Sequence, residues 1–171
     1  MSPEIPRIYV ALGSNLGNSR ENVEHALRRL EEISDLPIQS SSVWKSTPVD
    51  CPPGSPEFLN AVAELTPIGG ETPETFLWSL QNLEKELGRT PKKILNEARV
   101  IDLDLVAFGE EVRTSEFLTL PHPRAHLRKF VLAPLAELAP DLVLPGQKKS
   151  VRNLLSDLRT DEVVEIAVPR L

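Results

Sequence analysis

The sequence predicts an α+β protein with a ferredoxin-like fold: an antiparallel sheet with two helices packed on one face, plus C-terminal additions. Two observations predict it. Strand-like and helix-like segments follow one another as strand, helix, strand, strand, helix, strand, which is the order of the split βαβ fold. The 171 residues, 40% of them hydrophobic, are enough for a sizeable core. We therefore expect a single domain over residues 1–171.

The first half of the chain supplies three strands and a helix. Residues 8–13 form an apolar strand that ends in a polar turn over residues 14–18. Asn18 and Glu21 are typical of a capping box at a helix start. Apolar residues then recur at helical spacing, and the buried face of this helix is expected to consist of Val23, Ala26, Leu27, Leu30 and Ile33.

Residues 38–46 and 58–65 predict the next two strands. The loop 47–56 between them contains four prolines, and proline removes a backbone donor and fixes φ, so neither a ladder nor a helix can run through it. Loops of this length inside compact domains are more often functional than not. We therefore expect this loop to contribute to a site.

A second helix begins at Thr72, the expected N-cap, and Pro73, and its apolar stripe ends at Gly88. The remaining elements are a central strand, a short strand, a helix with Pro134 near its start or kinking it, a short helix and a last strand, over 99–109, 117–120, 130–138, 150–158 and 163–168. With both long helices on one face of the sheet, the other face is expected to be free to form a site.

Composition limits the possible functions. The net charge of −6 argues against a nucleic-acid partner, because binding a phosphate backbone requires a broad basic face. The sequence contains no apolar run of membrane-spanning length and no signal-peptide pattern. The lone cysteine, Cys51, cannot form an internal disulfide and fits a reducing compartment. We therefore expect a cytoplasmic protein without a membrane partner.

Two carboxylates, Asp102 and Asp104, interrupt the apolar central strand. Alternate strand residues share a face and lie about 6.5–7 Å apart at Cα, so both carboxylates can reach one Mg²⁺ or a pair of metal ions. A solvated polar face is the simpler alternative, but aspartate is disfavoured in strands. Cations cluster on both sides of the strand, at Arg89, Lys92, Lys93, Arg99, Arg124, Arg128 and Lys129. Carboxylates for a metal and cations for phosphate oxygens are typical of Mg-nucleotide chemistry.

A Walker A loop is absent from the sequence. The segment 13–17 contains glycines but lacks the lysine and the spacing of a P-loop. We interpret it as a strand-to-helix turn.

Seven short segments of the sequence are informative together, because their order and spacing are specific. They cover residues 9–17, 46–48, 58–61, 87–89, 99–104, 120–124 and 134–140. In these segments the chain resembles the 6-hydroxymethyl-7,8-dihydropterin pyrophosphokinases of folate biosynthesis. The resemblance implies a ferredoxin-like fold and two Mg²⁺ ions. It also implies transfer of pyrophosphate from ATP to the hydroxymethyl group of the reduced pterin, with release of AMP.

The resemblance further implies the residues of the site. Asp102 and Asp104 resemble the ligands of both metal ions, and Arg89 and Arg99 resemble the cations that meet the transferred phosphoryl groups. The implied nucleotide-binding residues are Gln81, Glu84, Arg89, Lys92, Arg99, Leu105, His122 and Arg128. The implied pterin-binding residues are Thr47, Pro48, Val49, Phe58, Asn60 and Phe130. A flat heteroaromatic ring gains from stacking on both faces, and an amide offers a donor and an acceptor to its edge.

We expect a monomer that acts on two small substrates, ATP and the pterin. Two alternatives remain open: another Mg-dependent phosphotransferase or nucleotidyltransferase on the same scaffold, and a non-catalytic ferredoxin-like module that binds a small ligand. A binding module has no need of two aspartates and two arginines together. The aromatic pair with Asn60 favours a pterin over other acceptors.

Overall fold

The computed structural model describes residues 4–47, 53–88 and 100–170, and the order of its elements confirms the predicted ferredoxin-like alternation. The helices and strands are β1 (Ile8–Ser14), α1 (Ser19–Leu30), β2 (Gln39–Ser40), β3 (Val43–Ser46), β4 (Phe58–Leu65), α2 (Pro73–Glu86), β5 (Asp102–Phe108), β6 (Arg113–Thr114), β7 (Thr119–Leu120), α3 (Lys129–Leu138), α4 (Val151–Asp157) and β8 (Val164–Val168). Short 3-10 helices lie at Glu31–Ile33 and Ala125–Leu127.

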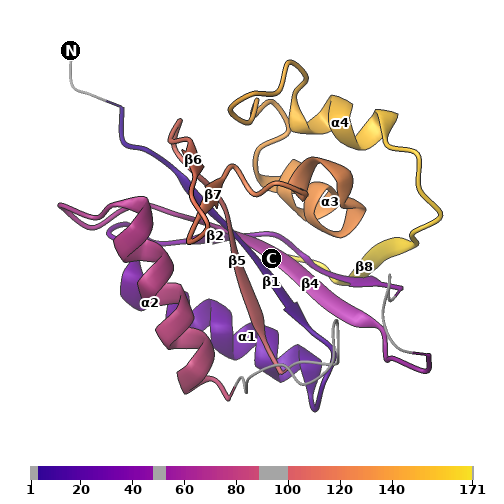
Figure 1. Cartoon of the computed structure of the whole chain (residues 1–171). Coiled ribbons are helices and arrows are strands. Elements are labelled where there is room, and N and C mark those ends of the chain that lie inside the picture. The colour runs from indigo at the N-terminus through magenta and orange to yellow at the C-terminus, as the bar shows by residue number, and fades with distance from the viewer. Residues whose placement is uncertain (1–3, 48–52, 89–99, 171) are drawn as a thin grey trace.

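The main sheet has the strand order β5-β1-β4-β3-β8, and β2 pairs beside β3 with β4 (Figure 1). Every pair of neighbouring strands is antiparallel. The four strands of the ferredoxin-like unit are β1, β3, β4 and β5, and β8 extends the sheet at the β3 edge. The predicted C-terminal additions are therefore confirmed as α3, α4 and β8.

Helices α1 and α2 cover one face of the sheet, as predicted (Figure 1). Their core includes the fully buried Ile8, Leu30, Phe76 and Leu80. The helix starts agree with the sequence signals: Asn18 Oδ1 accepts a hydrogen bond from the N–H of Glu21, and Thr72 forms a capping box with Thr75. Side-chain capping satisfies N–H groups that have no partner inside the helix.

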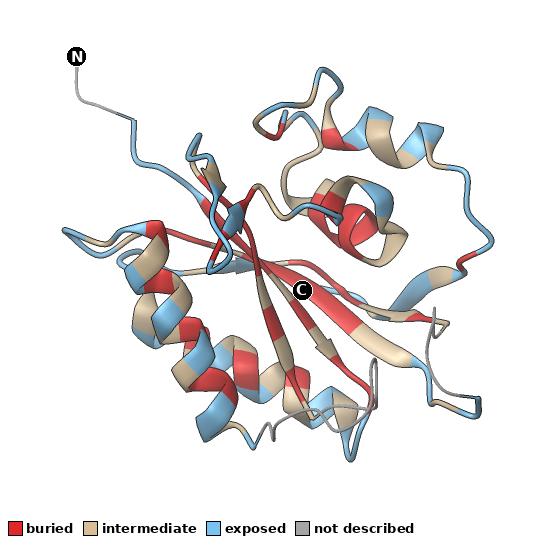
Figure 2. Cartoon of the chain, in the orientation of Figure 1, coloured by how far each residue is buried: buried red, intermediate tan, exposed pale blue. Residues whose placement is uncertain are grey.

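The opposite face of the sheet is only partly free, so the expectation of an uncovered face was wrong for one part of it. Helices α3 and α4 lie on this face (Figure 1), and a second core forms between them and the sheet. Val62 and Val106 from the sheet meet Leu132 and Leu135 of α3 in this core. Figure 2 shows buried residues along the strands and on the inner sides of the helices. The physical reason is that apolar residues occupy both faces of the central strands and require cover on both sides.

Three predicted strands differ from the structure. The strand expected over 38–46 is divided into β2 and β3, because it has one residue more than the β4 segment opposite it. Ser40 pairs with Ala63 and Trp44 pairs with Asn60, so four residue spacings on this side lie opposite three on β4. At the break, the Ser41 hydroxyl accepts the N–H of Val62 in place of a backbone carbonyl. The strand expected from residue 99 begins at Asp102 as β5, and the one over 117–120 is reduced to β7, which pairs with β6.

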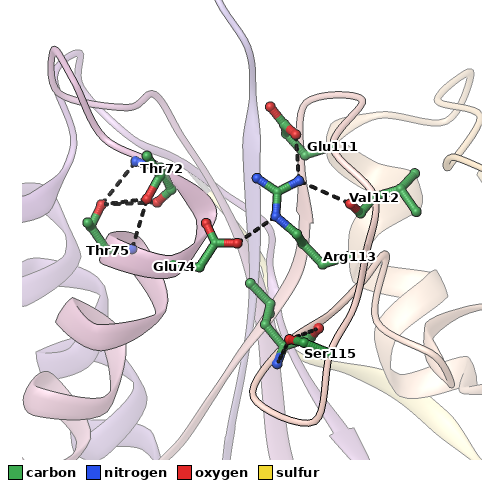
Figure 3. A network of polar contacts seen from close by, with 8 residues as sticks. Thr72, Glu74, Thr75, Glu111, Val112, Arg113 and Ser115 are labelled. Carbon is green, nitrogen blue, oxygen red and sulfur yellow. Dashed lines mark hydrogen bonds and ion pairs between the residues drawn. The ribbon is translucent and has the colours of Figure 1, made fainter.

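The β6–β7 hairpin is fixed to the start of α2. Arg113 forms ion pairs with Glu74 of α2 and with Glu111 in the connection from β5 to β6 (Figure 3). Strand β7 leads directly to Pro121 and His122, and the N–H of His122 donates to the carbonyl of Val106 at 2.8 Å. The hairpin therefore fixes the position of His122 beside β5.

Within the described ranges, no helix is both long enough and apolar enough to span a membrane.

Candidate active site

The site is organised by a row of residues that crosses the sheet. Asp102 on β5 is paired with Gly13 on β1, and Gly13 is paired with Asn60 on β4. Directly paired residues of antiparallel strands share a face, so Asp102 and Asn60 lie on the same face, two strand spacings or about 9–10 Å apart. Gly13 places no side chain between them. A Cβ at this position would lie 3.6 Å from Asn60 Oδ1 and 3.7 Å from Phe58 Cδ1.

The two carboxylates follow the predicted alternation. Asp102 and Asp104 are half-buried, whereas Ile101, Leu103 and Leu105 are buried on the opposite face. Glu84 of α2 supports this strand, since its Oε2 accepts the backbone N–H of Leu103 at 3.0 Å. This bond holds the peptide unit between the two aspartates. The side chain of Glu84 is itself buried.

Asp102 and Asp104 are the described residues best suited to hold a metal ion. Within the described part of the chain, no group of three or more histidine, cysteine or acidic side chains gathers around a common point. Mg²⁺ is commonly bound by one or two carboxylates, with substrate phosphates and waters filling its other positions. Two carboxylates on one strand face therefore fit a Mg²⁺ ion that is bound together with a nucleotide.

His122 lies close enough to Asp102 and Arg128 for their charges to shift its pKa. Its pKa is lowered to about 4, first by burial and then by the positive charge of Arg128, while Asp102 acts in the opposite direction. The Nδ1 atom accepts the N–H of Arg124 at 3.2 Å, so the neutral ring carries its proton on Nε2. His122 is thus a neutral hydrogen-bond donor near pH 7.

An aromatic and amide cluster lies at the Asn60 end of the row. The side chain of Asn60 is 3% exposed, and its Nδ2 donates to Ser46 Oγ at 2.7 Å. Phe58 precedes it on the same strand face. Across the site, the guanidinium of Arg128 lies 5.4 Å from the ring centre of Phe130 at the start of α3. Arg128 therefore connects the His122 side of the site with Phe130.

Comparisons with known proteins identify the family of the chain. The family model for 7,8-dihydro-6-hydroxymethylpterin-pyrophosphokinase (HPPK) matches residues 9–140. The chain belongs to the HPPK family.

Two bacterial relatives named 2-amino-4-hydroxy-6-hydroxymethyldihydropteridine pyrophosphokinase are similar over most of their length. The protein from Haemophilus influenzae is 39% identical over 145 residues, which cover 82% of this chain and 86% of the relative. The protein from Pseudomonas aeruginosa is 40% identical over 142 residues, which cover 82% of this chain and 85% of the relative.

Longer proteins also match over part of their length. "Folic acid synthesis protein fol1" of Pneumocystis carinii is 39% identical over 164 residues, and the match spans 96% of this chain but only 22% of that protein. The solved HPPK-DHPS structure of Plasmodium falciparum with SDX-DHP has a TM-score of 0.70 at 12% identity; the match covers 91% of this chain and 45% of that one. This likeness confirms the ferredoxin-like fold that HPPK domains share.

Several site residues expected from the HPPK resemblance lie outside the described residues: Pro48, Val49, Arg89, Lys92 and Arg99. Of the others, Gln81 is exposed on α2. Leu105 is 4% exposed, and its side chain packs in the core beneath α1 and α2, on the face away from Asp104. Its side chain is therefore not directed toward a nucleotide beside the aspartates. The structure places four of the predicted residues on one sheet face, namely Asp102, Asp104, Phe58 and Asn60. His122 lies in the range of the charges of Asp102 and Arg128, and Arg128 lies against Phe130.

Gly13 and Ser46 lie beside Asn60 in the candidate site, and the sequence did not single them out. Gly13 was placed at the end of the first predicted strand and in the turn segment 13–17, without a role of its own, although a glycine inside a strand often marks a position that another group approaches closely. Ser46 had no signal of its own, because its relation to Asn60 depends on the register of β3 against β4. Only the paired strands reveal its role.

Proposed function

We propose that the row from Asp102 to Asn60 is the reaction centre of this chain. As a member of the HPPK family, the chain is an ATP-dependent diphosphotransferase of folate biosynthesis, which transfers pyrophosphate from ATP to the hydroxymethyl group of 6-hydroxymethyl-7,8-dihydropterin. The observation that supports this assignment is that Gly13 has no side chain. Its position leaves room on one sheet face between the carboxylates of Asp102 and Asp104 and the amide of Asn60.

On this proposal, Asp102 and Asp104 would hold two Mg²⁺ ions, and the chemistry that these ions would supply is neutralisation of the triphosphate charge and polarisation of the phosphoryl oxygens. The side chains need to supply little covalent chemistry, since phosphoryl transfer depends mainly on positioning and charge stabilisation. Glu84 contributes by fixing the Leu103 amide between the two ligands. By the family resemblance, Arg89 and Arg99 meet the transferred phosphoryl groups, and Lys92 and Gln81 contact the nucleotide.

His122 and Arg128 then bind the phosphate side of the nucleotide. The neutral imidazole donates through Nε2, and Arg128 supplies a permanent positive charge beside it. A neutral donor adds no positive charge that would hold the ground state too tightly, whereas Arg128 interacts with the charge that develops during transfer.

The pterin lies at the other end of the row. Phe58 and Phe130 stack on its two faces, and Asn60 recognises its edge while Ser46 holds the amide in orientation. Thr47, Pro48 and Val49 contact the pterin from the loop that follows β3. Because Asn60 and Asp102 are about 9–10 Å apart, a pterin held at Asn60 directs its hydroxymethyl group over Gly13 toward the phosphates.

The test is product analysis. The purified chain is incubated with MgATP and 6-hydroxymethyl-7,8-dihydropterin, and the nucleotide products are separated. AMP together with the pyrophosphorylated pterin is the expected result. ADP would instead indicate a simple phosphotransferase, and no nucleotide turnover would indicate a binding module.

We also propose that residues 1–171 act as one domain and as a monomer in the cytoplasm, without a nucleic-acid or membrane partner. The net charge of −6 and the single cysteine support this proposal. Sedimentation velocity at several concentrations, with and without substrates, would detect a dimer.

A further inference from the structure

Glu162, in the connection from α4 to β8, makes contacts that the mechanism above does not use. The residue is only 9% exposed. Its carboxylate oxygens accept the backbone N–H of Lys129 at 3.3 Å and of Phe130 at 3.1 Å. These are the first two residues of α3, whose N-cap residue, Arg128, makes no side-chain capping bond within the described structure. A distant carboxylate therefore takes the place of a local cap.

The residues beside Glu162 hold the opposite flank of the proposed pterin site. The N–H of Thr47 donates to the carbonyl of Val163 at 3.2 Å, and the N–H of Val163 donates to Thr47 Oγ1 at 3.4 Å. The N–H of Glu162 donates to Thr160 Oγ1 at 3.1 Å, which fixes the turn. One short segment, residues 160–163, thus contacts both the start of α3 and the start of the loop after β3.

Burial of a carboxylate is costly unless its oxygens are satisfied. Burial raises the pKa of Glu162, while the N–H bonds from Phe130 and Lys129 and the charges of Lys129 and Arg128 oppose that shift. A serine, threonine or aspartate at the N-cap would cap α3 without burying a distant carboxylate. A distant carboxylate does something that a local cap cannot, because it ties the helix start to the β3–β8 edge of the sheet.

We infer that Glu162 is a positioning residue for pterin binding, which holds the backbone of Phe130 so that its ring lies at the spacing from Phe58 that a flat heteroaromatic ring requires. Glu162 does not itself touch the substrate. The inference rests on the proposed function, specifically on Phe130 as one stacking residue. The N–H of Lys129 belongs to the peptide unit that follows Arg128, so a smaller effect on the nucleotide is expected, and the larger effect falls on the pterin because Phe130 itself donates to Glu162.

The experiment compares Glu162→Ala and Glu162→Gln with a control, Glu165→Gln, at an exposed glutamate of β8 that pairs with Lys45. Binding of the pterin, in the presence of a non-hydrolysable MgATP analogue, and binding of the analogue alone are measured by calorimetry. We expect Glu162→Ala to raise the pterin Kd about tenfold or more, as for lost hydrogen bonds to a charged group. Glu162→Gln keeps one acceptor oxygen and should restore part of the affinity. The analogue Kd should change much less than the pterin Kd in both variants, and the control should match the wild type.

A double-mutant cycle with Phe130→Ala separates positioning from general destabilisation. Once the Phe130 ring is absent, Glu162→Ala should cause little further loss of pterin affinity. Fully additive losses, equal losses for pterin and analogue, or wild-type pterin affinity in both Glu162 variants would overturn the inference. If Glu162→Ala does not fold, Glu162→Gln alone decides: its pterin Kd must rise relative to the control. A wild-type protein that fails to bind the pterin would instead overturn the proposed function.

Discussion

Replacement of Gly13 by alanine should stabilise the protein and weaken pterin binding at the same time. Gly13 lies inside β1, and its added Cβ would make ordinary contacts of 3.6 Å and 3.7 Å with Asn60 and Phe58. The alanine therefore fits the folded chain. Because alanine has fewer unfolded conformations than glycine, the free energy of unfolding should rise by about 0.4–1 kcal/mol. For a chain of this length, that is about 1–4 °C in Tm.

The same methyl group lies between Asn60 and Asp102, where the hydroxymethyl end of the pterin passes on the proposed mechanism. Forcing an extra methyl into a filled site costs about 1–3 kcal/mol, which corresponds to a pterin Kd roughly 5- to 150-fold higher. Gly69→Ala is the matched control, since a Cβ there would meet nothing within 4 Å. Thermal unfolding and calorimetric titration with the pterin provide the two readouts. A Gly13→Ala variant with unchanged pterin affinity would show that the row is not the path of the substrate.

Three further predictions address the other parts of the site. Asp102→Ala and Asp104→Ala should each abolish most turnover, because a metal ligand is lost. A rate within about tenfold of the wild type, a difference of about 1.4 kcal/mol, would exclude the metal role. Asn60→Ala and Phe130→Ala should weaken binding of the pterin far more than binding of an ATP analogue, and equal losses in calorimetry would contradict the assignment. The pKa of His122 is about 4 in the folded protein and 6.5 when unperturbed. Between these two pH values the unfolded chain binds more protons than the folded chain. The free energy of unfolding therefore falls as pH decreases, by roughly 3 kcal/mol at most. Denaturant unfolding of His122→Gln should lack this component of the pH dependence, and an identical profile for the variant and the wild type would refute it.

The sequence allowed prediction of those parts of the site that depend on one strand or one helix at a time. The shared face of Asp102 and Asp104 follows from the two-residue period of a strand, and the starts of α1 and α2 follow from capping side chains. Gly13 could not be recognised in this way, because its importance depends on which residues lie opposite it. The register of β1 against β4 and β5 is a property of the folded sheet.

The cover on the second face of the sheet could have been predicted. Residues 60–63 of β4 are buried on both faces in succession, and strands buried on both sides appear as near-continuous apolar runs. The division between β2 and β3 had no comparable signal. It depends on the Ser41 hydroxyl, which replaces a carbonyl only when Val62 lies beside it.

The position of β1 has a consequence for how the chain folds during its synthesis. Ile8 of β1 pairs with Leu65 on one side and Phe108 on the other. While the ribosome is still adding the intervening residues, β1 has two unpaired edges and an apolar face with no cover, which favours aggregation. Pairing over such long separations is also slow. A nascent chain of this topology therefore depends on remaining shielded until β5 has been translated.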